Sequence, residues 1–251
     1  MIYEDDHVVV FNKPSGLQVL PANEFLENTL LSFARRYYQQ RNEANIASII
    51  SPVHRLGNLR EMIILILIQG RGTSGAILFT KSITHCQVLS AAMANREFEK
   101  KYLALVEGII ESEGEVIIEQ PIGPVPYSAI SITGSIFAAT PDGKYAKSVF
   151  RVLKKNKENN NTLVEVEIYT GRPHQIRIHM ASIGHPLVGD PLYSSGGLPT
   201  KMVESTNEGI REAVPGDCGY LLHSWKLGFP KVGTYEMIKI ICNPPDVLNP
   251  L

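Results

Sequence analysis

Four arginines lie in short segments punctuated by Gly and Pro, and their side chains are the strongest signal of anion binding in the sequence. They are Arg55 in PVHRLG, Arg71 in GRGTSG, and Arg172 with Arg177 in GRPHQIRIH. A guanidinium group offers a planar fork of donors that suits phosphate and carboxylate oxygens, and a neighbouring Gly lets a large polymer approach the backbone. Taken singly, each arginine is better explained as a residue that caps a helix end or binds a surface carboxylate.

Three histidines, His174, His179 and His185, lie close enough in sequence to be tested as metal ligands. The five-residue spacing of the first two separates them by more than about 100° on a helix, and no carboxylate accompanies them as in the zinc helix. We therefore expect no metal at this segment.

Paired carboxylates would suit a glycosidase, and two pairs occur, Glu97 with Glu99 and Glu165 with Glu167. Strand alternation or exposure on a helix explains both pairs equally well. The sequence has no P-loop, no GxGxxG that opens a helix and no GxSxG elbow, so nucleotide cofactors and serine-hydrolase chemistry have no support.

The elements that must position these residues alternate between strands and helices. Val8 to Phe11 reads as a strand followed by a KPSG turn, and Asn28 or Thr29 is a plausible cap for the helix that follows. AILFTKS has a buried-strand pattern. In ITHCQVLSAAMANREFEKKYLALVEG, the first half is helical by spacing and YLALVEG is a strand that Gly108 ends. Residues 146–171 predict a hairpin with a polar KKNKENNN tip, which we interpret as a solvated turn.

The segment that begins at Arg172 returns to helical spacing. Ile176, Met180 and Ile183 would form one buried face, while His174 and Arg177 would fall on a different face with Ala181. The pattern thus predicts that Arg177 points away from the core that anchors its helix. Residues 194–219 are polar and read as an irregular surface loop, after which LLHSWKLGFP and MIKIIC supply closing strands.

Composition indicates one soluble globular domain of 251 residues, with 44% hydrophobic and 20% charged residues. We expect an α/β (α+β) fold over residues 1–251, with a mainly antiparallel mixed sheet flanked by helices. The net charge of −1 excludes a positive field over the whole molecule, so a nucleic-acid partner would require basic residues gathered in a cleft.

The location is predicted from cysteine usage and from the longest apolar run. Three widely spaced cysteines without a CxxC pair fit a reducing compartment. The longest apolar run has seven residues, Met62 to Ile68, which is far short of a membrane span. Because the acidic start resembles no targeting signal, we expect an intracellular monomer in the cytoplasm or nucleus, or in an organelle if a targeting segment is missing from this chain.

Several long segments in order resemble the RluA family of pseudouridine synthases. IYEDDHVVVFNKPSGLQVLP looks like the family's opening strands, and PVHRLG with RGTSGAILFTKS looks like two halves of its HRLDRDTSGLLLFAK motif. EKKYLALVEG resembles the tyrosine-bearing strand, and TGRPHQIRIHMASIGHPLVGDPLY with LLHSWKLGFP resembles the C-terminal motifs. The resemblance covers nearly the whole chain and implies a pseudouridine-synthase fold with a central RNA-binding cleft.

The resemblance also implies the chemistry and the roles of individual residues. Uridine is isomerised by cutting its N-glycosidic bond, rotating the held base and forming a C-glycosidic bond, after the nucleotide has left its stack. Tyr102 would pack on the flipped base, Arg177 would be the basic partner of the catalytic aspartate, and Arg55 would contact RNA at the emptied position. Arg71, Arg172 and His174 are further candidate RNA contacts. No cofactor and no metal are implied, because the reaction is redox-neutral.

The family's catalytic aspartate has no counterpart here, because Gly57 occupies the position of the Asp in HRLD. A glycine offers neither a nucleophilic oxygen nor a base. Asp190 lies in GDPLY and would be a weak substitute.

Thirteen residues, 58–70, separate the two halves of this motif, and their removal restores the family's spacing. We interpret them as an insertion, and their apolar composition suggests a retained short intron or an error in the gene's assigned exons. Sequencing the mature transcript across this point tests that hypothesis, and finding the segment in the dominant message would contradict it.

Three functions remain to be compared. The first is an RNA pseudouridine synthase for tRNA or rRNA that acts without a preceding RNA-binding domain. The second is a catalytically impaired RNA-binding paralogue that retains the tyrosine and the arginines. The third, a metal-dependent hydrolase built on the histidines, predicts stoichiometric zinc in elemental analysis.

Overall fold

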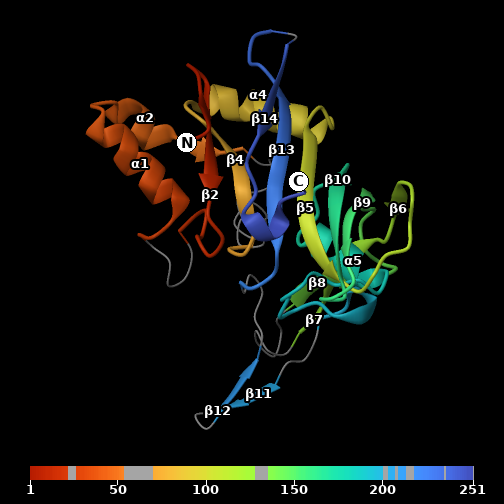
Figure 1. The fold of residues 1–251 in the computed structure, drawn as a ribbon. Helices are drawn as coiled ribbons and strands as arrows, with labels where there is room; N and C mark the ends of the chain where they lie inside the picture. Colours follow the sequence, from red (N-terminus) through yellow and green to blue (C-terminus); the bar gives the residue numbers. More distant parts are fainter. Residues whose placement is uncertain are drawn as a thin grey trace. The chain divides into compact units, whose positions relative to one another are not determined.

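The computed structural model describes residues 1–21, 27–53, 70–127, 135–199, 203–206, 209–212, 218–234 and 236–250. The chain forms two compact units, coloured along the sequence in Figure 1. Unit 1 comprises Met1–Lys100 and Ser224–Pro244, and unit 2 comprises Lys101–His223 and Pro245–Leu251. None of the described helices is long and apolar enough to cross a membrane.

Unit 1 is built on a sheet in which strands follow the order β1, β2, β4, β13, with β3 also paired to β4 and β14 to β13. The strands are β1 (Tyr3–Glu4), β2 (Val8–Lys13), β3 (Ser51–Pro52), β4 (Ser74–Thr80), β13 (Leu222–Pro230) and β14 (Met237–Ile241). The strand pairs β1–β2, β2–β4, β3–β4 and β13–β14 are antiparallel. The predicted strand that begins at Val8 is confirmed and extends to Lys13.

Among the described residues of unit 1, the helices are α1 (Leu30–Gln40), α2 (Ala44–Ile49) and α4 (Ile83–Ala94). The cap of α1 is Thr29, whose side chain accepts a hydrogen bond from the Ser32 N–H, and Ser82 caps α4 in the same way through the His85 N–H. Both predicted helices are therefore confirmed.

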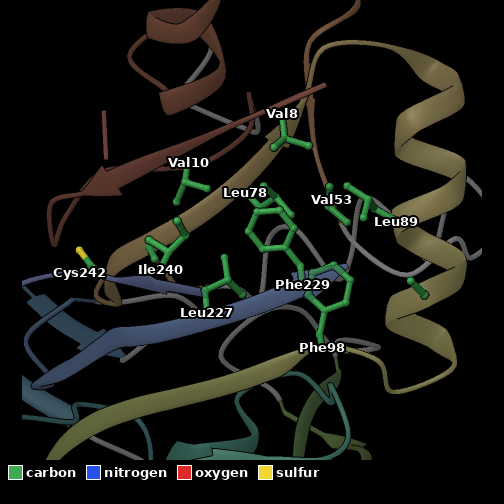
Figure 2. Close-up of a cluster of buried hydrophobic side chains, with 12 residues drawn as sticks. Val8, Val10, Val53, Leu78, Leu89, Phe98, Leu227, Phe229, Ile240 and Cys242 are labelled. Carbon is green, nitrogen blue, oxygen red and sulfur yellow. The ribbon is translucent and has the colours of Figure 1, made fainter. Parts of the chain in front are cut away.

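The core of unit 1 lies on both faces of the sheet because successive side chains of β2 point in opposite directions. Val8 and Val10 pack with Leu78, Leu89 of α4 and Phe229, and Figure 2 shows these side chains converging. Val9 faces the other way and packs with residues of α1 and α2. A strand buried on both faces explains the unbroken VVV run.

Unit 2 contains the strand order β5, β10, β9, β6 and two smaller antiparallel pairs, β7 with β8 and β11 with β12. Its strands are β5 (Glu99–Glu107), β6 (Val116–Ile118), β7 (Ile122–Pro126), β8 (Ser135–Ala139), β9 (Ser148–Asn156), β10 (Asn161–Ile168), β11 (Val203–Thr206) and β12 (Gly209–Glu212). The predicted hairpin is β9–β10, and Gly108 follows β5 as expected, with a φ of 80°. The mixed α+β class with mainly antiparallel sheets is confirmed.

One part of unit 2 differs from its prediction. Residues 194–219 were expected to form an irregular loop, yet Val203–Thr206 and Gly209–Glu212 pair as antiparallel strands. The prediction was wrong because polar residues dominate this stretch and conceal its strand signal, whereas backbone pairing requires no apolar side chains. Short single-turn helices occur at Ser195–Gly197 and Asp246–Leu248.

The helix α5 (Gln175–Ser182) carries the candidate site residue Arg177, begins directly after His174, and lies between two apolar clusters of unit 2. Ile176 and Met180 pack into the cluster that contains β5 and β10, while Ile178 and Ala181 pack into the cluster of β7 and β8. All residues from Gln175 to Ala181 are consequently buried.

Candidate functional site

Arg177 lies in the middle of α5 and forms a buried two-point ion pair with Asp190. Its Nε donates to Asp190 Oδ2 at 2.7 Å, and its Nη2 donates to Oδ1 at 2.6 Å. The side chains of Arg177 and Asp190 are only 2% and 1% exposed. Burial disfavours the charged guanidinium, but the hydrogen bonds and charge of Asp190 outweigh that effect and raise the pKa of Arg177. The guanidinium therefore keeps its positive charge, and the two-point contact fixes its orientation.

The prediction that Arg177 points away from the core was wrong. Helical spacing assigns faces relative to a single core, whereas the β7–β8 cluster covers the second face of α5. Ile183, which was predicted to be buried, is instead 39% exposed at the end of the helix. A charged residue on the second face is buried here because Asp190 neutralises it.

Asp190 is held by the turn that contains it. Its Oδ1 also accepts hydrogen bonds from the backbone N–H groups of Leu192 at 2.9 Å and Tyr193 at 3.1 Å. Such bonds from an Asp to the backbone two and three residues ahead stabilise turns. With four hydrogen bonds and almost no exposure, this carboxylate is held in place by the turn and by Arg177.

Two tyrosines enclose the guanidinium of Arg177. Its Cζ lies 4.1 Å from the ring centroid of Tyr220 and 5.0 Å from that of Tyr193. Aromatic faces attract a cation at these distances. Burial raises the pKa of the Tyr193 hydroxyl, so this group remains neutral in the physiological range.

Tyr102 lies on β5 opposite Val166 of β10 and is partly buried. It packs against the apolar cluster that also contains Tyr220 and Ile176. The core of unit 2 thus supports both Tyr102 and the aromatic partner of Arg177.

Gln175, the first residue of α5, fastens the chain that leads into the helix. Its Oε1 accepts hydrogen bonds from Thr170 Oγ1 at 2.7 Å and from the Arg172 N–H at 3.0 Å. Its Nε2 donates to Lys147 O and Ser148 Oγ, each at 2.9 Å. Arg172 lies in this fastened turn, where its Nε donates to Tyr145 O at 3.0 Å. Sequence reasoning missed Gln175, because an isolated glutamine at a helix start gives no distinctive signal.

His174 precedes α5 in a left-handed conformation, with a φ of 52°, and is 8% exposed. The Tyr193 hydroxyl donates to Phe137 O at 2.6 Å, so the proton between His174 and Tyr193 comes from the histidine Nδ1, at 2.7 Å. This residue was predicted to contact RNA, and that role stays a prediction.

The three histidines tested as metal ligands are not gathered into one site. His179 Nε2 donates to Gln120 O at 3.0 Å, which leaves Nδ1 to accept from Ser148 Oγ at 2.9 Å. His185 Nδ1 lies 2.8 Å from Glu107 O. Within the described residues, no group of three or more His, Cys, Asp or Glu side chains could hold a metal ion.

Three of the four carboxylates considered for glycosidase chemistry belong to ion pairs, and the fourth, Glu97, accepts a hydrogen bond from Asn95 Nδ2 at 3.2 Å. Glu165 accepts from Arg151 Nε at 2.9 Å, and Glu167 lies 3.4 Å from Lys101 Nζ. Glu99 lies 3.4 Å from Lys239 Nζ. These contacts favour the structural interpretation of the pairs.

Arg71 lies in unit 1, in a turn that is tied to the KPSG turn. Its backbone carbonyl accepts hydrogen bonds from the Gly16 N–H at 2.7 Å and from Lys13 Nζ at 3.0 Å. Ser15 Oγ donates to Gly72 O at 2.8 Å. The Arg71 side chain is partly exposed.

Arg55, Gly57 and residues 58–69 of the predicted insertion lie outside the described residues; of the insertion, only Gly70 lies within them. The structure therefore describes Tyr102, Arg71, Arg172, His174 and Arg177 among the predicted site residues.

Comparison with known proteins agrees with this architecture. A family model described as RNA pseudouridylate synthase matches residues 7–182. RNA pseudouridine synthase 5 of Arabidopsis thaliana is 40% identical over 283 aligned positions, covering 99% of this chain and 72% of that protein. An uncharacterized RNA pseudouridine synthase of Synechocystis is 36% identical, covering 100% of this chain and 75% of that protein. The chain belongs to the RluA-type family of RNA pseudouridine synthases.

Solved structures show the same fold. Human RNA Pseudouridylate Synthase Domain Containing 1 superposes with a TM-score of 0.65 at 21% identity, covering 97% of this chain and 82% of that chain. Human RNA Pseudouridylate Synthase Domain Containing 4 gives a TM-score of 0.64 at 17% identity, covering 99% and 89%.

Proposed function

We propose that this chain binds tRNA or rRNA and isomerises selected uridines to pseudouridine. The buried Arg177–Asp190 pair in a chain of this family carries the proposal, because it presents a fixed cation in the unit that holds Tyr102. The reaction exchanges one bond at the sugar carbon for another, so it requires neither a cofactor nor a metal.

One group of residues acts on the target nucleotide, and the other binds the RNA around it. Tyr102 packs on the flipped base, since an aromatic ring supports an unstacked base at low cost in polar contacts. Arg177 supplies the positive charge at the reacting nucleotide. Arg55, Arg71, Arg172 and His174 contact the RNA around it, and the arginines do so by forked hydrogen bonds to phosphates.

Gly57 favours a second function, RNA binding with little or no isomerisation. Covalent attack or proton transfer at the uridine needs a side-chain oxygen or another base, and glycine has none. In that case the family fold remains as a binding platform, and the uridine is held without being isomerised.

Tritium release from uridine-labelled RNA separates the two functions. Release by the wild-type chain supports a synthase, whereas binding without release supports the binding paralogue. A Gly57→Asp variant, prepared with and without residues 58–70, is expected to gain activity in at least one form. Failure of both forms, at wild-type RNA affinity, would contradict the placement of the catalytic position.

The wider organisation of the protein is part of the same proposal. Residues 1–251 act as one catalytic domain, with 58–70 inserted in the catalytic motif. The protein works as a monomer inside the cell, in the cytoplasm, the nucleus or an organelle. Analytical ultracentrifugation tests the monomer, and fluorescence microscopy of a tagged chain tests the location.

A further inference from the structure

Asp190 binds one edge of the Arg177 guanidinium, and one of its nitrogens, Nη1, has no hydrogen-bond acceptor among the described residues. Nε and Nη2 are both taken by Asp190, and Tyr220 packs closely against the group. Nη1 is buried and, within the described part of the chain, has no hydrogen-bond acceptor. All the hydrogen-bonding capacity of Nη1 is therefore available to a group that comes from elsewhere.

An unpaired donor of this kind is costly. Leaving a buried polar group unsatisfied costs roughly 1–3 kcal/mol, and more for a charged group. Family resemblance would provide a carboxylate acceptor at position 57, but Gly57 has no side-chain oxygen. A bound RNA carries phosphate and carbonyl oxygens that accept hydrogen bonds of this kind.

We propose that Asp190 is a positioning residue that holds Arg177 so that Nη1 donates to an oxygen atom of the bound RNA. The inference rests on the proposed function. Asp190 suits this role because two backbone N–H groups fix Oδ1 in the turn, so the carboxylate cannot follow a rotation of the arginine. Without that anchor, the guanidinium would lose the two hydrogen bonds that set its orientation, and its Nη1 would lose its direction.

The acceptor can be a phosphate oxygen or a carbonyl oxygen of the base, and salt dependence separates these sources. Loss of a phosphate contact reduces the slope of log affinity against log salt concentration by about one. Loss of a carbonyl contact weakens binding at every salt concentration by the same factor.

The test measures the affinity of fluorescently labelled, unmodified tRNA and rRNA transcripts for the wild type, Asp190→Asn, Arg177→Gln and the double variant. We expect Asp190→Asn to bind roughly tenfold or more weakly, because it weakens one charge-assisted hydrogen bond to the RNA. The double variant should bind no more weakly than Arg177→Gln alone, because both changes remove the same contact.

Glu165→Gln is the matched control, since it also removes a buried carboxylate from an ion pair in unit 2. It is expected to lower the melting temperature without changing RNA affinity. Equal loss of affinity in Glu165→Gln and Asp190→Asn would assign a merely structural role to Asp190 and overturn the inference.

A measurement on the unaltered protein covers the case in which Asp190→Asn does not fold. The side-chain ¹⁵N resonances of Arg177, assigned with an Arg177→Lys variant, should shift when RNA binds. Bound RNA with unchanged Arg177 resonances overturns the inference alone. A wild-type chain that binds neither transcript overturns the proposed function and the inference together.

Discussion

His179, which is buried in unit 2, makes the free energy of unfolding depend on pH. Burial lowers its pKa from 6.5 to about 4, which the hydrogen bond to Gln120 O opposes without reversing. The neutral ring fits its two partners, with Nε2 as donor and Nδ1 as acceptor. The histidine in the unfolded chain binds a proton near pH 6.5, while the folded one does so only near pH 4.

The free energy of unfolding should therefore be fully retained above pH 6.5 and should fall between pH 6.5 and about 4, by up to about 3 kcal/mol. His179→Gln removes this part of the pH dependence. Urea unfolding at several pH values measures it, with His185→Gln as a control for a histidine that is only partly buried. An equally steep pH dependence in His179→Gln would contradict the assignment.

Lys13 is a buried cation that joins two turns of unit 1. It is 4% exposed, and its Nζ donates to Pro14 O at 3.1 Å, Leu17 O at 2.9 Å and Arg71 O at 3.0 Å. Three carbonyl oxygens compensate for the loss of hydration, as a buried ammonium group requires.

Lys13→Met should destabilise the chain by about 2–4 kcal/mol, because it leaves three carbonyls without this donor. Thermal unfolding measures the loss. Lys231→Met is the control, since its partner Glu236 is on the surface and such pairs contribute about 0–1 kcal/mol. Similar losses in both variants would indicate that Lys13 is not a structural clamp.

Family resemblance predicted that Arg177 and Tyr102 are site residues, but the sequence did not reveal the partner of Arg177. Asp190 is 13 positions away from Arg177, beyond the reach of helical spacing, so only the tertiary fold could pair them. The Asp-Pro pair in GDPLY is typical of a turn, and this signal points to a carboxylate that accepts backbone hydrogen bonds.

At the scale of elements, strands and helices with a regular apolar period were predictable; the helix α5 was predicted too, but not that its second face is also buried. The strand β2, the helices α1 and α4 and the β9–β10 hairpin follow from residue spacing and capping. All residues of α5 from Gln175 to Ala181 are buried. A helix that packs against two apolar clusters has no exposed face, so its hydrophobic periodicity does not show which residues are buried.

Close approach of backbones fixes the packing of β4 against β13. Gly75, in β4, has a φ of 101°, and a Cβ atom on it would lie 2.4 Å from Ser224 O. Gly233 has a similar φ of 80° but has open space around its Cβ position. Both glycines have a left-handed backbone, but only Gly75 has a close neighbour. Comparing them therefore separates the free-energy cost of the backbone conformation from that of the steric contact.

Gly75→Ala should lower the free energy of unfolding by at least about 2 kcal/mol more than Gly233→Ala, whose cost of about 1 kcal/mol comes from the left-handed backbone alone. Chemical denaturation of both variants measures the difference. Equal losses would indicate that the two strands can separate without cost.

At the scale of the whole molecule, the net charge of −1 limits the electrostatic attraction to RNA. Affinity should therefore depend on a small set of arginines, among them Arg71 and Arg172. We expect the slope of log affinity against log salt concentration to correspond to roughly three or fewer phosphates. Titration between low and physiological salt measures it, and a much steeper slope would indicate a broad basic surface.

The residues on both sides of segment 54–69 are fixed by hydrogen bonds to neighbouring parts of unit 1. Upstream, β3 pairs with β4 and the Val53 N–H donates to Leu78 O. Downstream, the KPSG turn binds the carbonyls of Arg71 and Gly72. Because loop-closure entropy rises only slowly with length, added residues between such anchors cost little folding free energy. Variation in length can thus arise and persist here during evolution without shifting the register of β4, so that selection on this stretch acts through catalysis and RNA binding more than through folding.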